Sequence, residues 1–501
     1  MSNLSGLLAR YEADARVQQL KAAVASRARV QVRGCKGGVN GFLIAALSTQ
    51  LEVHQIVVAN DKEEAAYLQN TLANLLASRS VRFFPDSFKR PQYFEALDTH
   101  QVLQRTEAVN SLTQTASGGE ILVTYPEALF EMVVSPEVLN ENRILIKQGE
   151  NVDVPTIIAI LTEYGFSRED FVYEPGQYSI RGGIIDIFSY GNDFPYRIEL
   201  FDEEVETIRT FNPMDQLSVQ RIASVSIVPN INTRFQQKDK VALLDMLPAD
   251  ACIWMTDLNL LMDRIGECGR KAATVMQKMT ILDEGDLAEL FRDKAFVDEK
   301  RILAGLQDRP LVFLNDYDQP LAVQQTLQIQ TSLQPVFNKQ FDLLINDLTD
   351  HSSKGYDNFI FTDNAKQIDR FYAIFNDLNA HIQFRPVLSA IHEGFIDHDL
   401  KVVCYTDHQV FERFHRYKLK RGFTKDQAIN LKMLRELVPS DFVVHIDHGI
   451  GRFSGLEKIE VNGKVQESVR IVYKNNDLLY VGINSLHKLS RYSGATARRL
   501  Y

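Results

Sequence analysis

Five short apolar runs, each followed by a segment with helical periodicity, dominate the hydrophobic pattern of the chain. The runs are residues 30–34, 55–60, 121–125, 358–363 and 401–407. Most of them end in Asn, Thr or Asp, which are residues that cap the start of a helix. Strands that alternate with helices predict an α/β layer built on a parallel sheet. Because three runs precede residue 130 and two follow residue 355, we expect one sheet that long insertions interrupt.

The material between and after these runs has a different pattern. Residues 143–211 alternate in short strands and turns, whereas residues 236–347 mix helical stretches with an isolated strand. Residues 425–437 are amphipathic and predict a connecting helix. From residue 441 the pattern is all β, with hairpin or turn signals at Asn462-Gly463 and Asn475-Asn476. Several short strands so close together predict a small barrel.

Composition and charge narrow the class of protein. A chain of 501 residues is expected to form roughly three to five domains. The 45% of hydrophobic residues suits sizeable cores and argues against wholesale disorder. A net charge of −10 disfavours a basic surface that wraps nucleic acid, although it leaves room for one local basic patch. Direct DNA binding is therefore the lesser expectation.

The cysteines and the ends of the chain indicate a compartment. Cys35, Cys252, Cys268 and Cys404 lack metal-ligand or redox spacing, which is typical of a reduced, intracellular protein. No charged-then-apolar signal opens the chain, and no apolar run approaches the roughly 20 residues needed to cross a bilayer. We therefore expect a cytoplasmic protein without a membrane partner.

Residues 33–42, RGCKGGVNGF, have the glycine spacing of a phosphate-binding loop between a strand and a helix. A working loop reads G-x-x-x-x-G-K-[ST], in which the Lys neutralises phosphates and the hydroxyl binds Mg²⁺. Counted from Gly34, Val39 replaces the second glycine, Asn40 the lysine and Gly41 the hydroxyl residue. No acidic pair follows a strand at the spacing of a hydrolase.

We interpret this loop as vestigial and retained for its backbone turn. Weak nucleotide binding without hydrolysis and a true ATPase remain alternatives. The residues assigned to the degenerate, inactive loop are Gly34, Gly37, Gly38, Asn40 and Gly41.

Two longer segments resemble known families. Residues 174–218, which include SIRGGIIDIF and YRIELFDEEVETIRTF, resemble a block shared by the excision-repair helicase UvrB and the Mfd family of transcription-repair coupling factors. Residues 83–86 and 121–130 fit the same module. Residues 441–492 resemble the RNA-polymerase-interacting domain of the Mfd family, which also occurs in CarD-type transcription regulators. The two blocks in this order resemble the N-terminal portion of the Mfd family.

The resemblance implies an α/β multidomain fold. We expect a degenerate UvrB-like, helicase-like parallel-sheet core, an inserted small α+β domain, a divergent α/β third domain and a C-terminal SH3/Tudor-like small β-barrel. The expected boundaries are 1–135 for the first part of the core, 136–215 for the inserted UvrA-binding domain, 216–235 for the return to the core, 236–347 for the third domain, 348–420 for the second part of the core, 421–440 for a linker helix, 441–493 for the RNA-polymerase-interacting domain and 494–501 for a tail.

The family continues into a translocase motor and a C-terminal regulatory domain, neither of which is found in this sequence. We therefore expect a shortened chain with no ATPase activity and no cofactor of its own. The resemblance implies that ATP and Mg²⁺ belong to the motor, and that DNA is bound mainly there. It also implies that the regulatory domain masks the UvrA-binding face, which we expect to be open here.

Strand alternation in residues 196–201 separates two faces. Tyr196, Ile198 and Leu200 suit the core, and the other face then presents an arginine and an aromatic ring, the residue types enriched in interface hot spots. The resemblance implies that this face binds UvrA. The candidate UvrA-binding residues are Arg181, Arg197, Phe201 and Arg209. The alternative is a solvated arginine face with the phenylalanine tucked under the hairpin.

In the C-terminal block, the resemblance implies that one strand pairs with the β subunit of RNA polymerase by strand addition. The candidate RNA-polymerase-binding residues are Lys458, Ile459, Glu460 and Val461. The alternative for Ile459 is a core residue. His445, Asp447 and His448 have spacing that a metal site would allow, but no further ligands lie nearby, so we favour a polar turn and expect no metal.

Arg90, Tyr93 and Phe94 form an aromatic and basic cluster that would suit stacking on single-stranded DNA. No long aromatic hairpin accompanies them, and we favour a local loop core.

These features together predict an adaptor without enzymatic activity. One module would recruit UvrA of nucleotide excision repair, another would hold stalled RNA polymerase, and an inactive α/β core would join them. The alternatives are a UvrB-like ATP-dependent DNA helicase with a variant loop, and a CarD-like polymerase-binding regulator that rests on the last domain alone.

Overall fold

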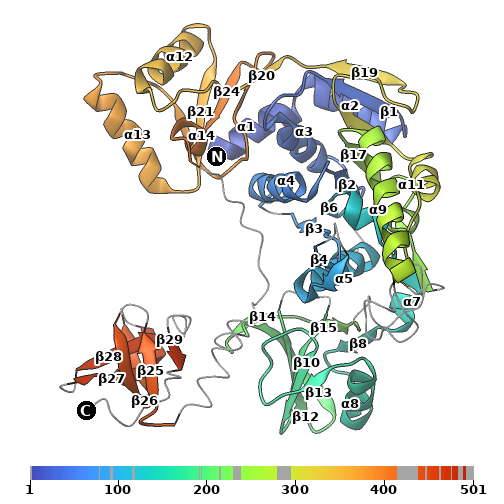
Figure 1. The fold of residues 1–501 in the computed structure, drawn as a ribbon, viewed down its shortest axis with the longest axis vertical. Helices are drawn as coiled ribbons and strands as arrows, with labels where there is room; N and C mark the ends of the chain where they lie inside the picture. Colours follow the sequence, from blue (N-terminus) through green and yellow to red (C-terminus); the bar gives the residue numbers. More distant parts are fainter. Residues whose placement is uncertain are drawn as a thin grey trace. The chain divides into compact units, whose positions relative to one another are not determined.

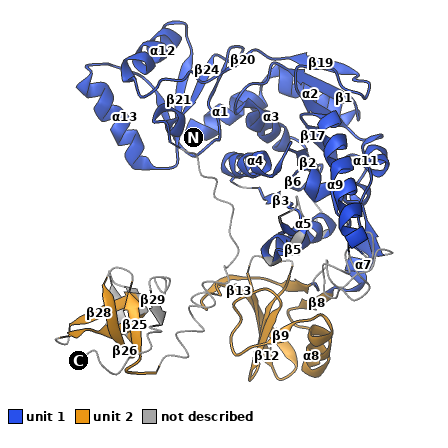
Figure 2. Ribbon diagram, in the orientation of Figure 1, with its two compact units in different colours: residues 1–143, 228–419 blue, residues 144–227, 420–501 orange. Residues whose placement is uncertain are grey.

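The computed structural model divides the chain into two compact units, residues 1–143 with 228–419 and residues 144–227 with 420–501 (Figure 2). The residues that it describes are 3–77, 79–90, 94–114, 119–190, 192, 194–213, 216–229, 239–278, 291, 295–413, 438–445, 448–461, 464–474, 477–482 and 489–491. Within these residues, no helix is long and apolar enough to cross a membrane.

A parallel sheet of seven strands, in the order β19-β1-β18-β17-β2-β6-β3, forms the centre of the first unit (Figure 1). Its central strands are apolar runs such as QIVV, CIWM and LVFL that are buried on both faces, as expected for a parallel sheet covered by helices, whereas the edge strand QTLQ is largely exposed. The strands are β1 (Arg29–Arg33), β2 (Gln55–Val58), β3 (Val81–Phe83), β6 (Ile121–Thr124), β17 (Cys252–Met255), β18 (Leu311–Leu314) and β19 (Gln325–Gln328).

A second sheet of five strands lies in the same unit, in the order β20-β23-β24-β21-β22. It is mixed, because β24 pairs parallel with β21 and antiparallel with β23. The strands are β20 (Thr331–Leu333), β21 (Asp357–Thr362), β22 (Arg385–Leu388), β23 (Phe395–Asp397) and β24 (Val402–Thr406).

The expectation of one interrupted sheet is therefore wrong. The runs at 358–363 and 401–407 form β21 and β24 of the second sheet, and do not join the first three runs. In their place, β17 and β18 from residues 236–347, which were assigned to a separate third domain, lie between β1 and β2. Parallel neighbours are joined by crossovers of any length, so a local pattern shows that a strand is buried but not which strand it pairs with.

Helices surround both sheets of this unit. Asp14 caps α2 and Asp61 caps α4 by accepting hydrogen bonds from backbone N–H groups of the first turn. The helices are α1 (Asn3–Glu12), α2 (Ala15–Ala25), α3 (Val39–Ser48), α4 (Lys62–Leu75), α5 (Thr99–Gln114), α6 (Pro126–Phe130), α7 (Pro136–Glu141), α9 (Leu258–Lys278), α11 (Glu299–Leu306), α12 (Phe341–Ser353), α13 (Ala365–Asp377) and α14 (Asp407–Val410). Short pieces complete the unit: β4 (Phe88–Arg90), β5 (Glu95–Leu97), β7 (Val133–Val134), β16 (Lys240–Val241) and η2 (Leu243–Met246).

Residues 144–227 fold as a small α+β body. Its first strand β8 (Ile144–Lys147) pairs antiparallel with its last strand β15 (Ser224–Ile227). Between them lie the helix α8 (Val154–Glu163) and a six-stranded sheet in the order β14-β13-β12-β11-β10-β9. The strands of this sheet are β9 (Ser167–Arg168), β10 (Gln177–Arg181), β11 (Ile184–Phe188), β12 (Tyr196–Phe201), β13 (Glu204–Phe211) and β14 (Ser218–Arg221).

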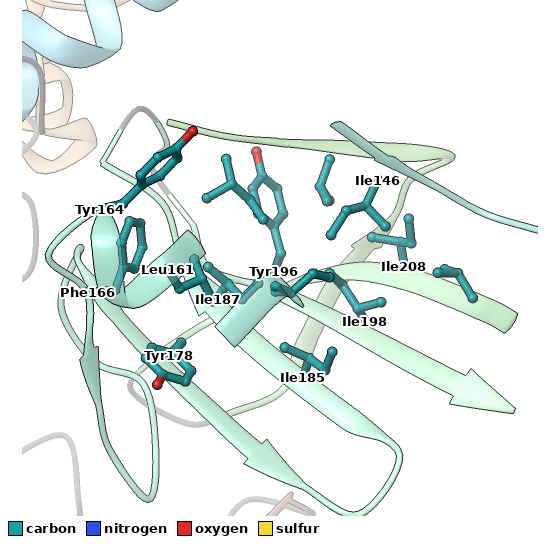
Figure 3. Packing of buried hydrophobic residues seen from close by; sticks show 14 residues of the cluster. Ile146, Leu161, Tyr164, Phe166, Tyr178, Ile185, Ile187, Tyr196, Ile198 and Ile208 are labelled. Carbon is teal, nitrogen blue, oxygen red and sulfur yellow. The ribbon is translucent and has the colours of Figure 1, made fainter. Parts of the chain in front are cut away.

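One face of the six-stranded sheet carries the core of this body (Figure 3). Ile185, Ile198 and Ile208 are direct cross-strand neighbours in β11, β12 and β13 and are almost fully buried. Leu161 from α8 packs against the same cluster. The alternation of apolar residues along each strand therefore places the opposite side chains on the second face of the sheet.

The C-terminal segment is all β where the structure describes it, as the sequence predicts. Its five strands pair antiparallel in the order β28-β27-β26-β25-β29. They are β25 (Phe442–His445), β26 (Gly449–Val461), β27 (Lys464–Val472), β28 (Leu478–Gly482) and β29 (Leu489–Arg491). Closure into a barrel stays a prediction. Pairing of Val461 with Lys464 fits the predicted hairpin, while both predicted turns and the helix at 425–437 lie outside the described residues.

Candidate functional site

The hairpin of β12 and β13 separates core and surface residues as the alternation predicts. Tyr196 and Ile198 are 6% and 0% exposed, whereas Phe201 at the end of β12 is 76% exposed. The turn follows directly, with Asp202 at a φ of 57°. The alternative in which Phe201 is tucked under the hairpin is therefore wrong.

Arg197 lies on the face opposite the core, but its side chain is only 17% exposed. Its Nε and Nη2 donate to the two carboxylate oxygens of Asp186 at 2.7 and 2.8 Å. Its Nη1 donates to the backbone oxygen of Gln216 at 3.1 Å, and the guanidinium lies over the Phe211 ring at 4.3 Å. The hydrogen bonds with Asp186 raise the pKa of Arg197 above its ordinary value. Arg197 is thus held within the face.

Arg181 ends β10 and also reaches Asp186. Its Nη2 donates to Asp186 Oδ2 at 2.5 Å, and its guanidinium lies over the Phe171 ring at 4.4 Å. The side chain is 35% exposed. An open groove, which Arg168, Glu169, Asp170 and Phe171 also line, runs beside it. The guanidinium of Arg181 is therefore held by Asp186, while part of the side chain remains accessible to a partner.

Arg209 pairs with Glu199 rather than with Asp186. Its Nη2 forms an ion pair with Glu199 Oε1, and Glu199 Oε2 accepts a hydrogen bond from the Thr207 hydroxyl at 2.7 Å. The hydrogen bond from Arg209 is the largest of the effects that lower the pKa of Glu199. In the sheet register, Arg209 lies directly beside Arg197.

The structure thus brings the four candidate UvrA-binding residues to one part of a single sheet. We call this set the arginine face, made up of Arg181, Arg197, Arg209 and Phe201 with the acidic partners Asp186 and Glu199. Sequence reasoning missed Asp186. The sequence does contain a signal for this residue. Alternation in IIDIF places Asp186 away from the core, on the side where Arg197 lies.

The candidate RNA-polymerase-binding residues are described only by their backbone. Lys458, Ile459, Glu460 and Val461 lie near the end of β26 and pair with residues 464–467 of β27. The structure does not describe their side chains, so the choice between a contact and a core position for Ile459 stays open.

The histidines of the same segment lie close together. The rings of His445 and His448 have their centroids 4.8 Å apart, while Asp447 is outside the described residues. In the described part of the chain, no group of three or more His, Cys, Asp or Glu side chains is placed to hold a metal ion. The absence of a metal site stays a prediction.

Phe94 belongs to a loop core, as we favoured. It is 4% exposed and packs edge-on against the rings of Phe88 and Phe291 at 4.9 and 5.5 Å. Tyr93 and the side chain of Arg90 lie outside the described residues.

The glycine loop after β1 holds one of the chain's own carboxylates. The backbone N–H of Gly34 donates to Asp316 Oδ1 at 2.6 Å, and Lys36 Nζ donates to Asp316 Oδ2 at 2.7 Å. These hydrogen bonds, the one from Lys36 first, lower the pKa of Asp316. A negative charge therefore already lies against the donors of this loop.

The two central glycines of the loop pack against backbone. Gly37 has a φ of +60°, and a Cβ added to it would lie 2.5 Å from the oxygen of Gly394. A Cβ on Gly38 would lie 2.4 Å from the oxygen of Glu393. These glycines are required by the close approach of another segment of the same unit. The oxygens that approach them are hydrogen-bond acceptors, the wrong polarity for a phosphate.

Comparison with known proteins assigns families to two parts of the chain. Residues 144–232 match the family model of the UvrB interaction domain. Residues 437–493 match the model of the CarD-like/TRCF RID domain. The first match covers the whole body that carries the arginine face, and the second covers the five-stranded C-terminal sheet.

Proteins named transcription-repair-coupling factor are similar to nearly the whole chain. The protein from Bacillus subtilis (strain 168) is 23% identical over 535 residues, which cover 93% of this chain and 45% of that protein. The protein from Staphylococcus haemolyticus (strain JCSC1435) is 22% identical over 551 residues, covering 96% and 46%. The chain therefore spans just under half the length of these curated relatives.

We predict that Arg197→Ala destabilises the 144–227 body, because it leaves the buried Asp186 carboxylate without its main partner. The loss should be about 3 kcal/mol, as for other broken buried ion pairs. Phe201→Ala should change stability by less than about 0.5 kcal/mol, since the ring is exposed. Hydrogen exchange of the β10–β13 amides in the full chain would measure both. Equal protection in the two variants would contradict this prediction.

Proposed function

We propose that this chain, a homologue of the transcription-repair-coupling factors, is an adaptor that binds UvrA through residues 144–227 and RNA polymerase through the C-terminal sheet. The observation that carries the proposal is the presence of two family matches in one chain, each covering a different sheet. An adaptor needs this arrangement, because each partner then has its own surface. The first unit serves as the scaffold that connects them.

The arginine face supports the UvrA half of the proposal. The face carries an exposed aromatic ring and partly exposed arginines, which is the composition of an interface centre. The sheet that carries these side chains is packed on a complete core, so the face is rigid before a partner arrives. Rigid faces lose little conformational freedom on binding.

The geometry of β26 supports the polymerase half. Residues 458–461 pair with β27 on one side, whereas the described pairing of β26 with β25 covers only residues 449–452. Among the described residues, the other backbone edge of residues 458–461 thus has no strand partner, which suits the addition of a strand. In this mode the main chain supplies the hydrogen bonds, and alternate side chains supply specificity. The β subunit of RNA polymerase is the partner that we propose.

We also propose that the first unit does not hydrolyse ATP and needs no cofactor. The loop that resembles a phosphate-binding loop has Asn40 and Gly41 where a lysine and a hydroxyl residue are required. The Asp316 carboxylate and the Glu393 and Gly394 oxygens would repel a phosphate there. A UvrB-like ATPase is therefore the weaker alternative. A CarD-like regulator is weaker too, because it leaves residues 144–232 without a role.

Phe201→Ala should weaken UvrA binding by at least about 2 kcal/mol, or roughly thirtyfold in Kd, because an exposed aromatic is a typical hot spot. Titration of UvrA against the full chain measures the change. Leu145→Ala is the matched control, since Leu145 is an exposed apolar residue of β8 in the same body, 52% exposed, and it should bind within about twofold of the unchanged chain. If the unchanged chain binds no UvrA, this half of the proposal fails.

Ile459→Ala should weaken binding of the RNA polymerase β subunit by at least about 1 kcal/mol, roughly fivefold, if its side chain contacts the partner. The same variant should keep its UvrA affinity, and Phe201→Ala should keep its polymerase affinity, because the two residues lie in different sheets. Surface plasmon resonance with each partner in turn would show this crossed pattern. Loss of both affinities in either variant would contradict an adaptor with two independent surfaces.

Incubation of the chain with ATP and Mg²⁺ should release no phosphate above the buffer rate, and ATP should not raise the melting temperature. The physical reason is that the loop lacks the groups that neutralise phosphate and bind Mg²⁺. Phosphate release that Asn40→Ala, at the lysine position of the loop, abolishes would favour the UvrB-like ATPase instead.

A further inference from the structure

Asp186 occupies an unusual position for a carboxylate. It lies in the middle of β11, between Ile185 and Ile187 of the core, and its side chain is 0% exposed. In the sheet register its neighbours are Ser179 in β10 and Arg197 in β12. Buried carboxylates are costly unless they are paired and hydrogen-bonded. Asp186 is paired and hydrogen-bonded in this way by Arg197 and Arg181.

The carboxylate binds two guanidinium groups from opposite sides. Arg197 donates to both oxygens, and Arg181 donates to Oδ2. Each guanidinium also lies over an aromatic ring, that of Phe211 or Phe171. A planar group held by a carboxylate at its edge and by a ring at its face has one orientation. Asp186 therefore fixes both the place and the plane of two arginines.

Without acidic partners, the arginine side chains of this face would repel one another. Arg197, Arg209 and Arg221 are direct cross-strand neighbours in β12, β13 and β14, an arrangement that is destabilising for like charges. Asp186 and Glu199 offset part of this charge, and Glu204, opposite Phe201, and Glu169 and Asp170, which line the groove beside Arg181, offset more. Net charge therefore does not select the partner, whereas the planar fork of the 35% exposed Arg181 matches the geometry of a carboxylate.

We propose that Asp186 is a positioning residue for UvrA binding: it holds Arg181 in the orientation in which that arginine receives a carboxylate of the partner. This inference rests on the proposed function, and it goes further by separating residues that touch the partner from residues that position them. Arg181 and Phe201 touch the partner. Asp186 and Arg197 stay behind the surface and act through Arg181. Preorganisation of this kind lowers the cost of binding, because the side chain is ordered in advance.

The test is a double-mutant cycle on UvrA affinity in the full chain, with Asp186→Asn, Arg181→Ala and the pair. Asp186→Asn keeps the shape and removes the charge. It should weaken binding about tenfold, and in the Arg181→Ala background it should have less than about a threefold effect, because the residue through which it acts is gone. A merely structural role would give the same loss in both backgrounds.

Two controls separate orientation from net charge and from folding. Glu206→Gln removes one acidic charge from an exposed position of β13, and should leave the UvrA affinity within about twofold. Urea titration of every variant shows that each is folded under the binding conditions. Should Asp186→Asn fail to fold, Arg181→Lys tests the same idea, since lysine keeps the charge but lacks the planar fork. It should bind as weakly as Arg181→Ala.

Additive losses in the cycle, or an Arg181→Lys variant that binds like the unchanged chain, would overturn the positioning role while leaving the adaptor function intact. If the unchanged chain shows no UvrA binding, the proposed function itself has failed. The two failures are therefore distinguishable.

Discussion

The antiparallel pairing of β8 with β15 is the constraint on which the candidate site depends. Ile144 and Ile227, the first and last residues of the inserted body, are direct cross-strand partners. The chain therefore leaves the first unit and returns to it at one place. Because the ends are tied together, the residues between them can fold around their own core of Ile185, Ile198 and their neighbours. A rigid, separately folded body of this kind can present a binding surface without disturbing the parallel sheet that it interrupts.

We propose that the second face of that body combines stability with recognition. Its central carboxylate, Asp186, is buried between Arg197 and Arg181, and of these two arginines Arg181 is the one that a partner is proposed to contact. Replacement of a buried ion pair by apolar residues often costs no stability, so stability alone does not explain the acid. The orientation that Asp186 imposes on Arg181 and Arg197 is a second role, besides stability, that we propose for this acid. Under the proposed function, a substitution at Arg197 should change both folding and binding, whereas one at Phe201 should change binding alone. Binding measurements on this face are informative only beside stability measurements.

Much of the inserted body could be predicted from the sequence, because its strands are amphipathic. The alternation in YRIELF separated Tyr196 and Ile198 from Phe201, and the structure has them on those sides. The pairing of Arg197 with Asp186 was not anticipated, since it joins residues of neighbouring strands whose register depends on turn geometry. The parallel sheet was harder still. Its central strands are buried on both faces, so nothing in CIWM or LVFL distinguishes a neighbour of β1 from a member of another sheet.

The glycine loop shows why a motif must be judged by what surrounds it. Glycines recur in phosphate-binding loops because the backbone must approach a ligand closely. In this chain the same requirement comes from the protein, since a Cβ on Gly34 would lie 2.0 Å from the oxygen of Ile329 and one on Gly38 would meet Glu393. Those residues belong to connections near the second sheet, so the loop acts as a joint between two sheets of one unit. Asp316 supplies the negative charge that its donors would otherwise take from a phosphate. Glycine spacing alone therefore indicates that some group lies close to the loop backbone. Only the residues at the lysine and hydroxyl positions indicate whether that group is a phosphate or another part of the protein.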